Sequence, residues 1–196
     1  MEKKLPIYRL TIKEDLESDQ EVSAIALVDL PAIGENFFAF AEAHKFAINE
    51  DERIIVGAAM VPDQPIYRVD PDGKEYFVVF DKQTIIKICQ KFYTKGLQMS
   101  ANEMHDPGKQ VDGLTFYQSW IADESKGIPK MKQFEHLPDG TWFLGAKVNN
   151  DETWAKVKSG EFRGFSVEGM FDMTPVKLNT TPEMILEQLK NLLSEI

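Results

Sequence analysis

Apolar and polar positions along most of this chain alternate with the period of a β-strand. Alternation over residues 6–12 and an apolar run over 24–28 predict two strands near the N-terminus. Later strand patterns occupy residues 54–61, 75–80, 97–104, 114–121, 131–136, 141–148 and 162–171. The turn sequence Asp139-Gly140 predicts that 131–136 and 141–148 form a hairpin. The pattern therefore favours a protein built mainly from strands.

Three segments show helical spacing instead. After Asp81, which is placed to cap a helix N-terminus, apolar residues recur at i, i+3, i+4 and i+7 until Gly96. A shorter helix is predicted between the polar residues 149–151 and Gly160. Residues 180–183 begin a third helix, whose apolar residues form one stripe. Such a stripe usually packs on its own domain, and the alternative is that it binds a partner or a second copy of the chain.

A polar stretch at residues 48–52 is the candidate boundary within the chain. It separates an N-terminal arm with short strands over 1–52 from a main domain over 53–178. The C-terminal amphipathic helix over 179–196 forms the third part. Because helices accompany a majority of strands, the expected fold class is α+β.

Charge and composition narrow the class of protein. The 22 basic and 32 acidic residues give a formal net charge of −10, which disfavours a protein whose main work is to bind the nucleic-acid backbone. The single cysteine, Cys89, excludes an intrachain disulfide and a cysteine-rich zinc site. No stretch approaches the roughly 20 apolar residues of a membrane span, and no apolar run follows the first residues. We therefore expect a soluble protein without a secretory signal.

The strand over 162–171 carries the first candidate for chemistry. Strand alternation places Phe165 and Val167 on a core face and Ser166 and Glu168 on the other face, where the carboxylate lies about 7 Å along from the hydroxyl. A nucleophilic serine needs open approach for a substrate, a neighbouring base and donors for the oxyanion. From spacing alone, a serine on a solvated strand face is the favoured interpretation.

Three histidines could supply the base. His105 follows the strand over 97–104, one face of which is apolar until it ends in ionisable residues, as expected where a strand leaves the core at the rim of a site. Asp106-Pro107-Gly108 is expected to break that strand. His136 lies near the predicted hairpin turn and is expected to be exposed, and His44 has no identifiable partner. His105 is therefore the candidate base, although a lone histidine is more often structural.

The order of these elements resembles a known protein family. The segments that carry the resemblance are 105–107, 111–113, 139–148, 157–160 and 162–167, with 25–33 upstream. Together they resemble the tailed-phage prohead (capsid maturation) protease family, and most closely its XkdF-like branch. The protease resemblance covers about residues 53–171, with the arm extending it.

The resemblance implies a fold and a set of site residues. The fold would be similar to herpesvirus assemblin, with a mostly antiparallel, barrel-like β core flanked by helices. Ser166 would match the nucleophile and His105 the base. Many relatives have Ile-Gly after the serine where this chain has Val167-Glu168, and assemblin uses a second histidine that this chain lacks after Ser166. Glu168 is therefore our choice for the third member, and Glu103 is the reserve because it shares the face predicted for His105.

The resemblance also implies a function. The protein would be a serine endopeptidase that needs no metal or organic cofactor and acts in the host cytoplasm, inside the assembling prohead. Its substrates would be segments of the scaffold and of the major capsid protein. A homo-oligomer formed through the C-terminal helix is one expected partner state, and no nucleic-acid or membrane partner is expected. The alternative is a catalytically inactive phage structural or cargo protein that retains the protease fold.

Overall fold

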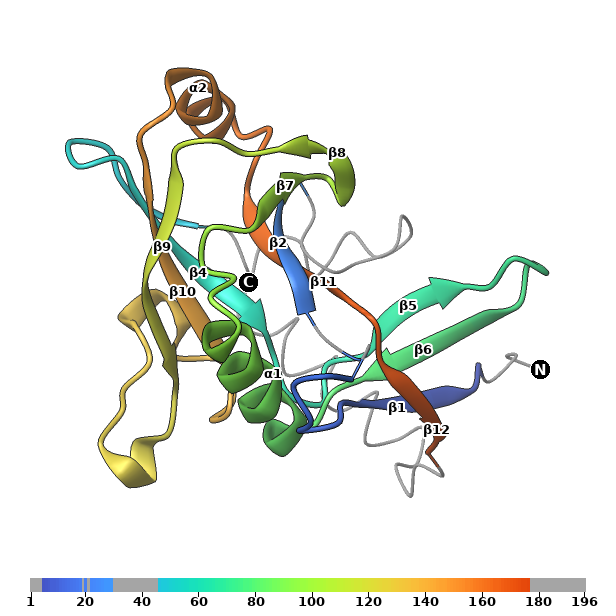
Figure 1. Ribbon diagram of the computed structural model, residues 1–196. Helices are drawn as coiled ribbons and strands as arrows, with labels where there is room; N and C mark the ends of the chain where they lie inside the picture. The colour runs from blue at the N-terminus through green and yellow to red at the C-terminus, as the bar shows by residue number, and fades with distance from the viewer. Residues whose placement is uncertain (1–4, 19, 21, 30–45, 177–196) are drawn as a thin grey trace.

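The computed structural model describes residues 5–18, 20, 22–29 and 46–176 (Figure 1). Its strands are β1 (Ile7–Thr11), β2 (Val22–Val28), β3 (Ala47–Asn49), β4 (Ile54–Met60), β5 (Ile66–Val69), β6 (Glu75–Val79), β7 (Ala101–Glu103), β8 (Asp106–Gln110), β9 (Leu114–Ile121), β10 (Trp142–Val148), β11 (Gly164–Gly169) and β12 (Asp172–Pro175). The α-helices are α1 (Lys82–Thr94) and α2 (Asp151–Ser159). The C-terminal helix predicted over 179–196 lies outside the described residues.

The described strands form three four-stranded sheets, in the orders β12-β1-β6-β5, β3-β4-β10-β9 and β11-β2-β7-β8. The pairs β1–β6 and β2–β7 are parallel, and the other strand pairs are antiparallel. This arrangement confirms the α+β class. Among the described strands the predicted barrel-like core is not found, because each sheet ends in two edge strands that do not pair with each other. The three sheets remain open.

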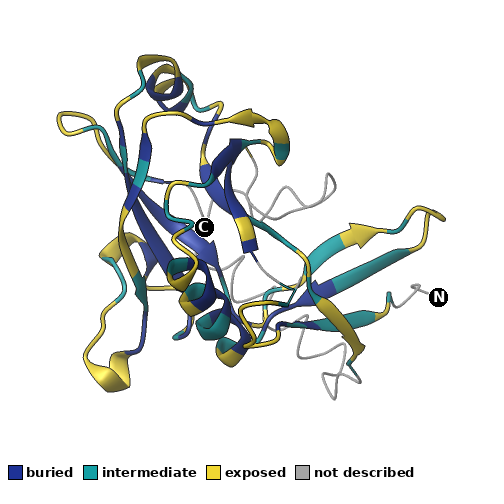
Figure 2. Cartoon of the chain, in the orientation of Figure 1, coloured by how far each residue is buried: buried dark blue, intermediate teal, exposed yellow. Residues whose placement is uncertain are grey.

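The core fills the space where the sheets and α1 face one another. Helix α1 packs against β2 and β10 (Figure 1). Its Ile85, Ile88 and Phe92 are fully buried, as the spacing predicts, and each stabilises the fold by about 1.5–3 kcal/mol through burial. The Asp81 carboxylate caps the helix by accepting a hydrogen bond from the Thr84 N–H at 2.8 Å. Strands β4 and β10 are buried through most of their length (Figure 2).

The predicted hairpin is wrong in its first arm. Strand β10 forms, but its partners are β4 and β9. Residues 132–134 form a short 3₁₀ helix instead of a strand. Phe134 and Leu137, three residues apart, are both buried, and the Phe134 ring packs 5.4 Å from that of Phe143. This spacing of three fits a helical turn, so tertiary packing of Phe134 outweighs the alternation seen locally.

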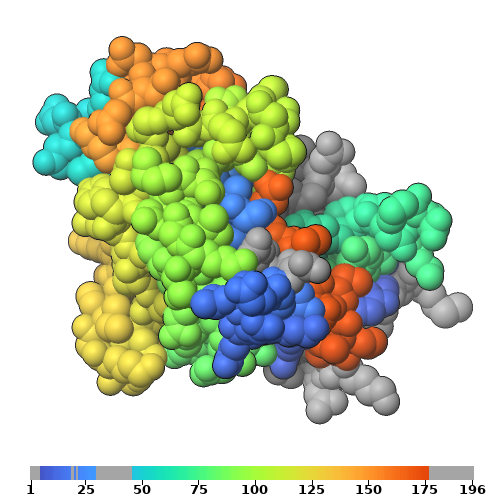
Figure 3. Space-filling view, in the orientation of Figure 1, coloured from blue at the N-terminus to red at the C-terminus, as the bar shows by residue number. Residues whose placement is uncertain are grey.

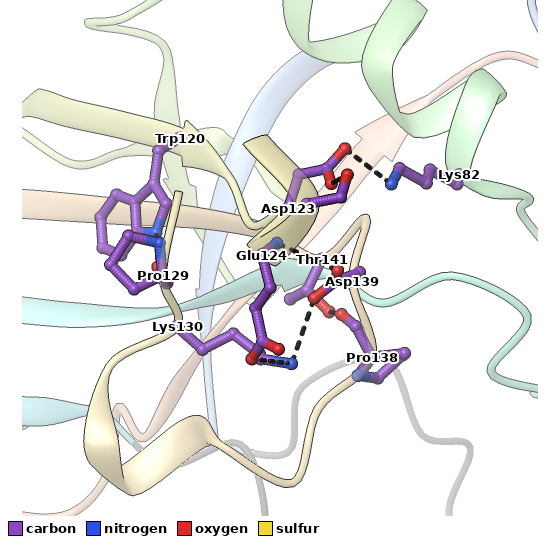
Figure 4. Close-up of polar contacts among 10 residues, drawn as sticks. Lys82, Trp120, Asp123, Glu124, Pro129, Lys130, Pro138, Asp139 and Thr141 are labelled. Atoms are coloured by element: carbon purple, nitrogen blue, oxygen red, sulfur yellow. Dashed lines mark hydrogen bonds and ion pairs between the residues drawn. The ribbon is translucent and has the colours of Figure 1, made fainter. Parts of the chain in front are cut away.

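A buried carboxylate holds the long connection between β9 and β10. Asp123 is only 5% exposed, and its side chain contacts Lys82 Nζ at 2.9 Å, Lys126 Nζ at 3.1 Å and Ser125 Oγ at 2.6 Å. Figure 4 shows the contact between Asp123 and Lys82. The hydrogen bonds from Ser125, Lys82 and Lys126 hold the pKa of Asp123 well below its ordinary range. The connection is therefore tied to the start of α1.

The stretch expected to be an N-terminal arm contributes one strand to each of the three sheets, and its β3 pairs with β4 at a sheet edge. β1 lies between β12 and β6, and β2 lies between β11 and β7. Ile25 and Leu27 of β2 are completely buried. The division of the chain at residue 52 stays a prediction, but β2 is an inner strand of the sheet that carries Ser166. In the part of the chain described here, neither helix is long and apolar enough to cross a membrane.

Candidate active site

Strand β11 presents Ser166 and Glu168 on one face. It pairs antiparallel with β2, with Ser166 opposite Ala26 and Glu168 opposite Ala24. On the other face Phe165 is buried, with its ring centroid 4.6 Å from that of Phe46. This aromatic contact anchors the strand, and the two-residue period then directs the Ser166 and Glu168 side chains to the opposite side. The predicted division of faces is therefore correct at Phe165 and Ser166, although Ser166 is 3% exposed and thus buried rather than solvated.

His105 lies in a tight turn rather than at the end of a strand. The predicted strand over 97–104 is reduced to β7, which ends at Glu103, and Asp106-Pro107-Gly108 begins the next strand, β8, instead of breaking the first one. The turn between β7 and β8 consists of Met104 and His105, with φ of 51° and 62°. Positive φ at both positions is typical of the type I′ hairpin turn, and it is uncommon for residues other than glycine. The turn directs His105 back over the sheet.

The His105 imidazole lies between a hydroxyl and a carboxylate. Its Nε2 is 3.0 Å from Ser166 Oγ, within hydrogen-bonding distance. Its Nδ1 is 3.8 Å from Glu168 Oε2, a distance at which the carboxylate acts on the ring chiefly through its charge. Residues 105 and 166 are far apart in the chain, and the sheet order β11-β2-β7-β8 brings them together.

The environment of His105 favours its neutral form. The side chain is 41% exposed, and its partial burial lowers the pKa of His105 below the ordinary value of 6.5. The negative charge of Glu168 opposes this shift, and the positive charge of Arg68 adds to it. Because the imidazole is then mostly uncharged near neutral pH, it is in the protonation state that a general base requires.

Asn102, which the sequence analysis did not single out, holds the carboxylate. Its Nδ2 donates a hydrogen bond of 2.6 Å to Glu168 Oε2, and the residue is 1% exposed. Asn102 is opposite Ala26 in β2, and Ala26 is opposite Ser166 in β11, so the three residues form one row across the sheet. The small Ala26 side chain leaves space on this face for the larger groups on either side. The sequence does not distinguish Asn102 from the other polar residues of the predicted strand 97–104, because its burial depends on the neighbouring strands.

The reserve residue Glu103 is engaged elsewhere. Its two carboxylate oxygens accept hydrogen bonds from Lys156 Nζ of α2 at 2.8 and 2.9 Å. Glu103 and His105 do not share a strand face, because β7 ends at Glu103 and the turn follows. His136 is exposed in the connection before β10, and His44 lies outside the described residues. Of the two carboxylates considered, Glu168 is the one that the fold brings to His105.

Ser166 also lines a cavity of about 270 Å³. Residues of β1, β4, β5, β6, β11 and β12 form its walls, so strands of all three sheets meet there. Most of the described lining side chains are apolar, and Arg68 is the one charged side chain among those described. Figure 3 shows atoms of β11 (orange) at the surface between those of β2 (blue) and of the β5–β6 region (teal). A ligand in this cavity would contact the serine.

Two other kinds of site, a metal site and a reactive cysteine, are not supported by the described residues. Within residues 5–18, 20, 22–29 and 46–176, no group of three or more His, Cys, Asp or Glu side chains could hold a metal ion. Cys89 is partly buried, and its Sγ lies 3.7 Å from Ser119 Oγ. Burial raises the pKa of the Cys89 thiol, which disfavours the reactive thiolate.

A hydroxyl, an imidazole and a carboxylate in this order form the arrangement found in serine hydrolases. The chain matches the family model described as "Putative phage serine protease XkdF" over residues 43–174. It therefore belongs to this family, and the matched region includes His105, Ser166 and Glu168. No curated protein and no solved structure matches the chain, so the similarity to assemblin stays unconfirmed.

Proposed function

We propose that the protein is a serine endopeptidase in which Ser166 is the nucleophile and His105 the general base. The observation that carries this proposal is the 3.0 Å contact between Ser166 Oγ and His105 Nε2. When the Nδ1 proton points toward Glu168, Nε2 is free to accept the hydroxyl proton. Membership of a phage serine protease family supports the same reaction class.

The reaction proceeds by acyl transfer. Ser166 Oγ attacks a peptide carbonyl as its proton passes to His105, and His105 then gives that proton to the departing amine. Water then attacks the carbonyl of the acyl-enzyme, with His105 again acting as base. The ester bond breaks, and His105 returns a proton to Ser166 Oγ. Backbone N–H groups near Ser166 hold the oxyanion, and Arg68 adds positive charge at the cavity that Ser166 lines.

Glu168 and Asn102 support His105 in its role as general base. The Glu168 carboxylate stabilises the imidazolium that forms when His105 takes the proton. Its charge favours the tautomer with the proton on Nδ1. The hydrogen bond from buried Asn102 fixes one carboxylate oxygen, so that the charge faces the ring throughout the cycle. Glu168 is thus the third member of the proposed site, and Asn102 is its positioning residue.

The proposed substrates are segments of the phage scaffold and of the major capsid protein, cleaved inside the assembling prohead in the host cytoplasm. The support is the phage origin of the family together with the proposed peptidase site. A net charge of −10 also suits an enzyme whose partners present basic surfaces.

A cleavage assay tests the function. The purified protein is incubated with its scaffold and major capsid protein beside Ser166→Ala and His105→Ala, with Ser159→Ala as a matched control at an exposed serine. We expect new fragments with the wild type and the control only. Fragments that persist with Ser166→Ala would overturn the assignment of the nucleophile. No fragments from any version would favour the inactive structural or cargo protein.

A further inference from the structure

The residues that line the cavity beside Ser166 favour one class of substrate side chain. The cavity lining includes Ala59 of β4, Ile66 of β5 and Phe171 after β11, and none of the described residues that line it is acidic. Apart from Ser166, its polar side chains are those of Gln64, Arg68 and Tyr76. A carboxylate or ammonium group placed against the apolar walls would lose its hydration. The described lining offers no acidic partner to an ammonium group, and its one cation, Arg68, is exposed at the surface rather than buried in the cavity.

The cavity is large enough to hold one side chain of a substrate. Its volume of about 270 Å³ lies just below the roughly 300–1,000 Å³ of small-molecule sites. A leucine, methionine or phenylalanine side chain fits this space. Burying such a side chain contributes about 1.5–3 kcal/mol to binding, which a small side chain such as alanine cannot supply.

The position of the cavity assigns it to one residue of the substrate. A serine that attacks a peptide carbonyl approaches to about 3–3.5 Å of the carbonyl carbon, so the side chain of that residue lies within a few ångströms of Ser166 Oγ. The same serine lines the cavity. Building on the proposed endopeptidase activity, we infer that this cavity is the specificity pocket of the enzyme. It binds a medium to large apolar side chain on the residue that supplies the attacked carbonyl.

Two residues in the wall of the pocket, which belong to different sheets, limit its size. Ala59 is 7% exposed and belongs to β4, whereas Ile66 is half-buried and belongs to β5. A larger side chain at Ala59 narrows the pocket, and a smaller one at Ile66 widens it. Among the described lining residues Arg68 carries the only charge, and from its exposed position on β5 it is available to the oxyanion or to an acidic group elsewhere on the substrate.

The test uses acetyl-Ala-Ala-X diphenyl phosphonates with X as Ala, Leu, Met, Phe, Asp or Lys. In each reaction the Oγ–P bond forms, one phenoxy P–O bond breaks, and the hydroxyl proton passes through His105 to the leaving phenol. We expect the Leu, Met and Phe probes to label Ser166 at least about tenfold faster than the Asp and Lys probes. Labelling without preference for apolar X, or preference for Asp or Lys, overturns the pocket while leaving the nucleophile in place.

Variants of residues in the pocket wall test whether these residues determine the preference among the probes. Ala59→Leu should slow labelling by the Phe probe more than by the Ala probe, and Ile66→Ala should shift the preference from Leu toward Phe. Val69→Ala is the matched control, because Val69 is an exposed residue of the same strand and does not line the cavity. A thermal unfolding curve for each variant shows that the fold is retained. If both wall variants fold and neither changes the order of the probes, the inference is wrong.

A binding experiment separates failure of the pocket from failure of the proposed reaction. Ser166→Ala, which cannot be acylated at this position, is titrated with the acetyl-Ala-Ala-X amides, and binding is followed by calorimetry. Binding that is tighter for Leu, Met and Phe, and that Ala59→Leu weakens for Phe, supports the pocket even if no probe labels the wild type. Equal or undetectable binding across the series, together with labelling that shows no preference, overturns it.

Discussion

His105 occupies a backbone conformation that few side-chain-bearing residues adopt, and its neighbour Met104 shares it. Each such residue costs on the order of 1–3 kcal/mol unless the surrounding structure compensates. Here the pairing of β7 with β8 on both sides of the turn supplies that compensation. The result is an imidazole placed 3.0 Å from Ser166 Oγ and facing the Glu168 carboxylate. The chemistry of the site thus depends on a strained turn as well as on the identity of its residues.

Replacing Glu168 tests its role in orienting and stabilising the imidazole. Glu168→Gln should lower kcat/KM by on the order of 10²-fold or more. The imidazolium loses the carboxylate that stabilises it, and the ring loses its preference for the tautomer with the proton on Nδ1. The pKa of His105 should fall further, because the charge that raises it is removed. Peptide hydrolysis as a function of pH measures both effects. Glu103→Gln, which alters a carboxylate bound to Lys156, is the control and should leave kcat/KM within a few-fold of the wild type.

Arg68 is expected to shift the pH dependence of the reaction. Its positive charge lowers the pKa of His105, so Arg68→Gln should raise that pKa and move the acid limb of kcat/KM to higher pH. Arg68→Lys keeps the charge and should leave the limb near its original position. The ring-proton titration of His105 by NMR checks the pKa directly. An unchanged titration in Arg68→Gln would contradict this electrostatic role.

At the scale of elements, the best-predicted features are those defined by neighbouring residues. Helix α1 begins after Asp81 and buries Ile85, Ile88 and Phe92, as predicted. Its capping residue and its stripe of apolar residues lie within a few helical turns of one another, so the local sequence is sufficient to predict them. The segment 131–136 is different, since its apolar residues find partners only when β10 and β9 are in place. Its conformation depends on contacts such as that of Phe134 with Phe143.

The connection between β9 and β10 should be sensitive to acid through Asp123. The pKa of Asp123 is lower in the folded state than its ordinary value, so its stabilising effect is present above about pH 4 and is lost as pH falls toward the folded-state pKa. Asp123→Asn should therefore lower the free energy of unfolding at pH 7. The gap to the wild type should narrow between pH 4 and pH 2. Denaturant unfolding at several pH values measures this, with Asp112→Asn at an exposed aspartate as the control.

At the scale of the whole molecule, the site lies where three open sheets meet. Its residues come from β7, the turn after it and β11, while the cavity walls come from β1, β4, β5, β6 and β12 as well. Strand β2 separates β11 from β7 and carries Ala26 in the row between Ser166 and Asn102. The family match begins at residue 43, after β2. The complete site therefore needs a strand outside the matched region.

Removing that strand should abolish the fold of the site. A chain lacking residues 1–29 loses β1 and β2, including the fully buried Ile25 and Leu27, whose burial contributes about 1.5–3 kcal/mol each. It also leaves β11 and β7 without their shared neighbour. We expect no cooperative thermal unfolding and no phosphonate labelling. A cooperatively folded, labelled product would contradict this prediction and would show that residues 30–196 suffice.

The sequence by itself determined the strand-rich α+β class, both described helices with their caps, and the shared face of Ser166 and Glu168. These depend on periods of 2 and 3.6 residues and on capping groups, which act between residues close in the chain. Only the tertiary structure decided that His105 reaches Ser166 and that Glu103 pairs with Lys156. It also decided that Asn102 holds Glu168 and that the sheets stay open. These outcomes depend on which strands become neighbours, because pairing is set by the burial of side chains that are distant in sequence.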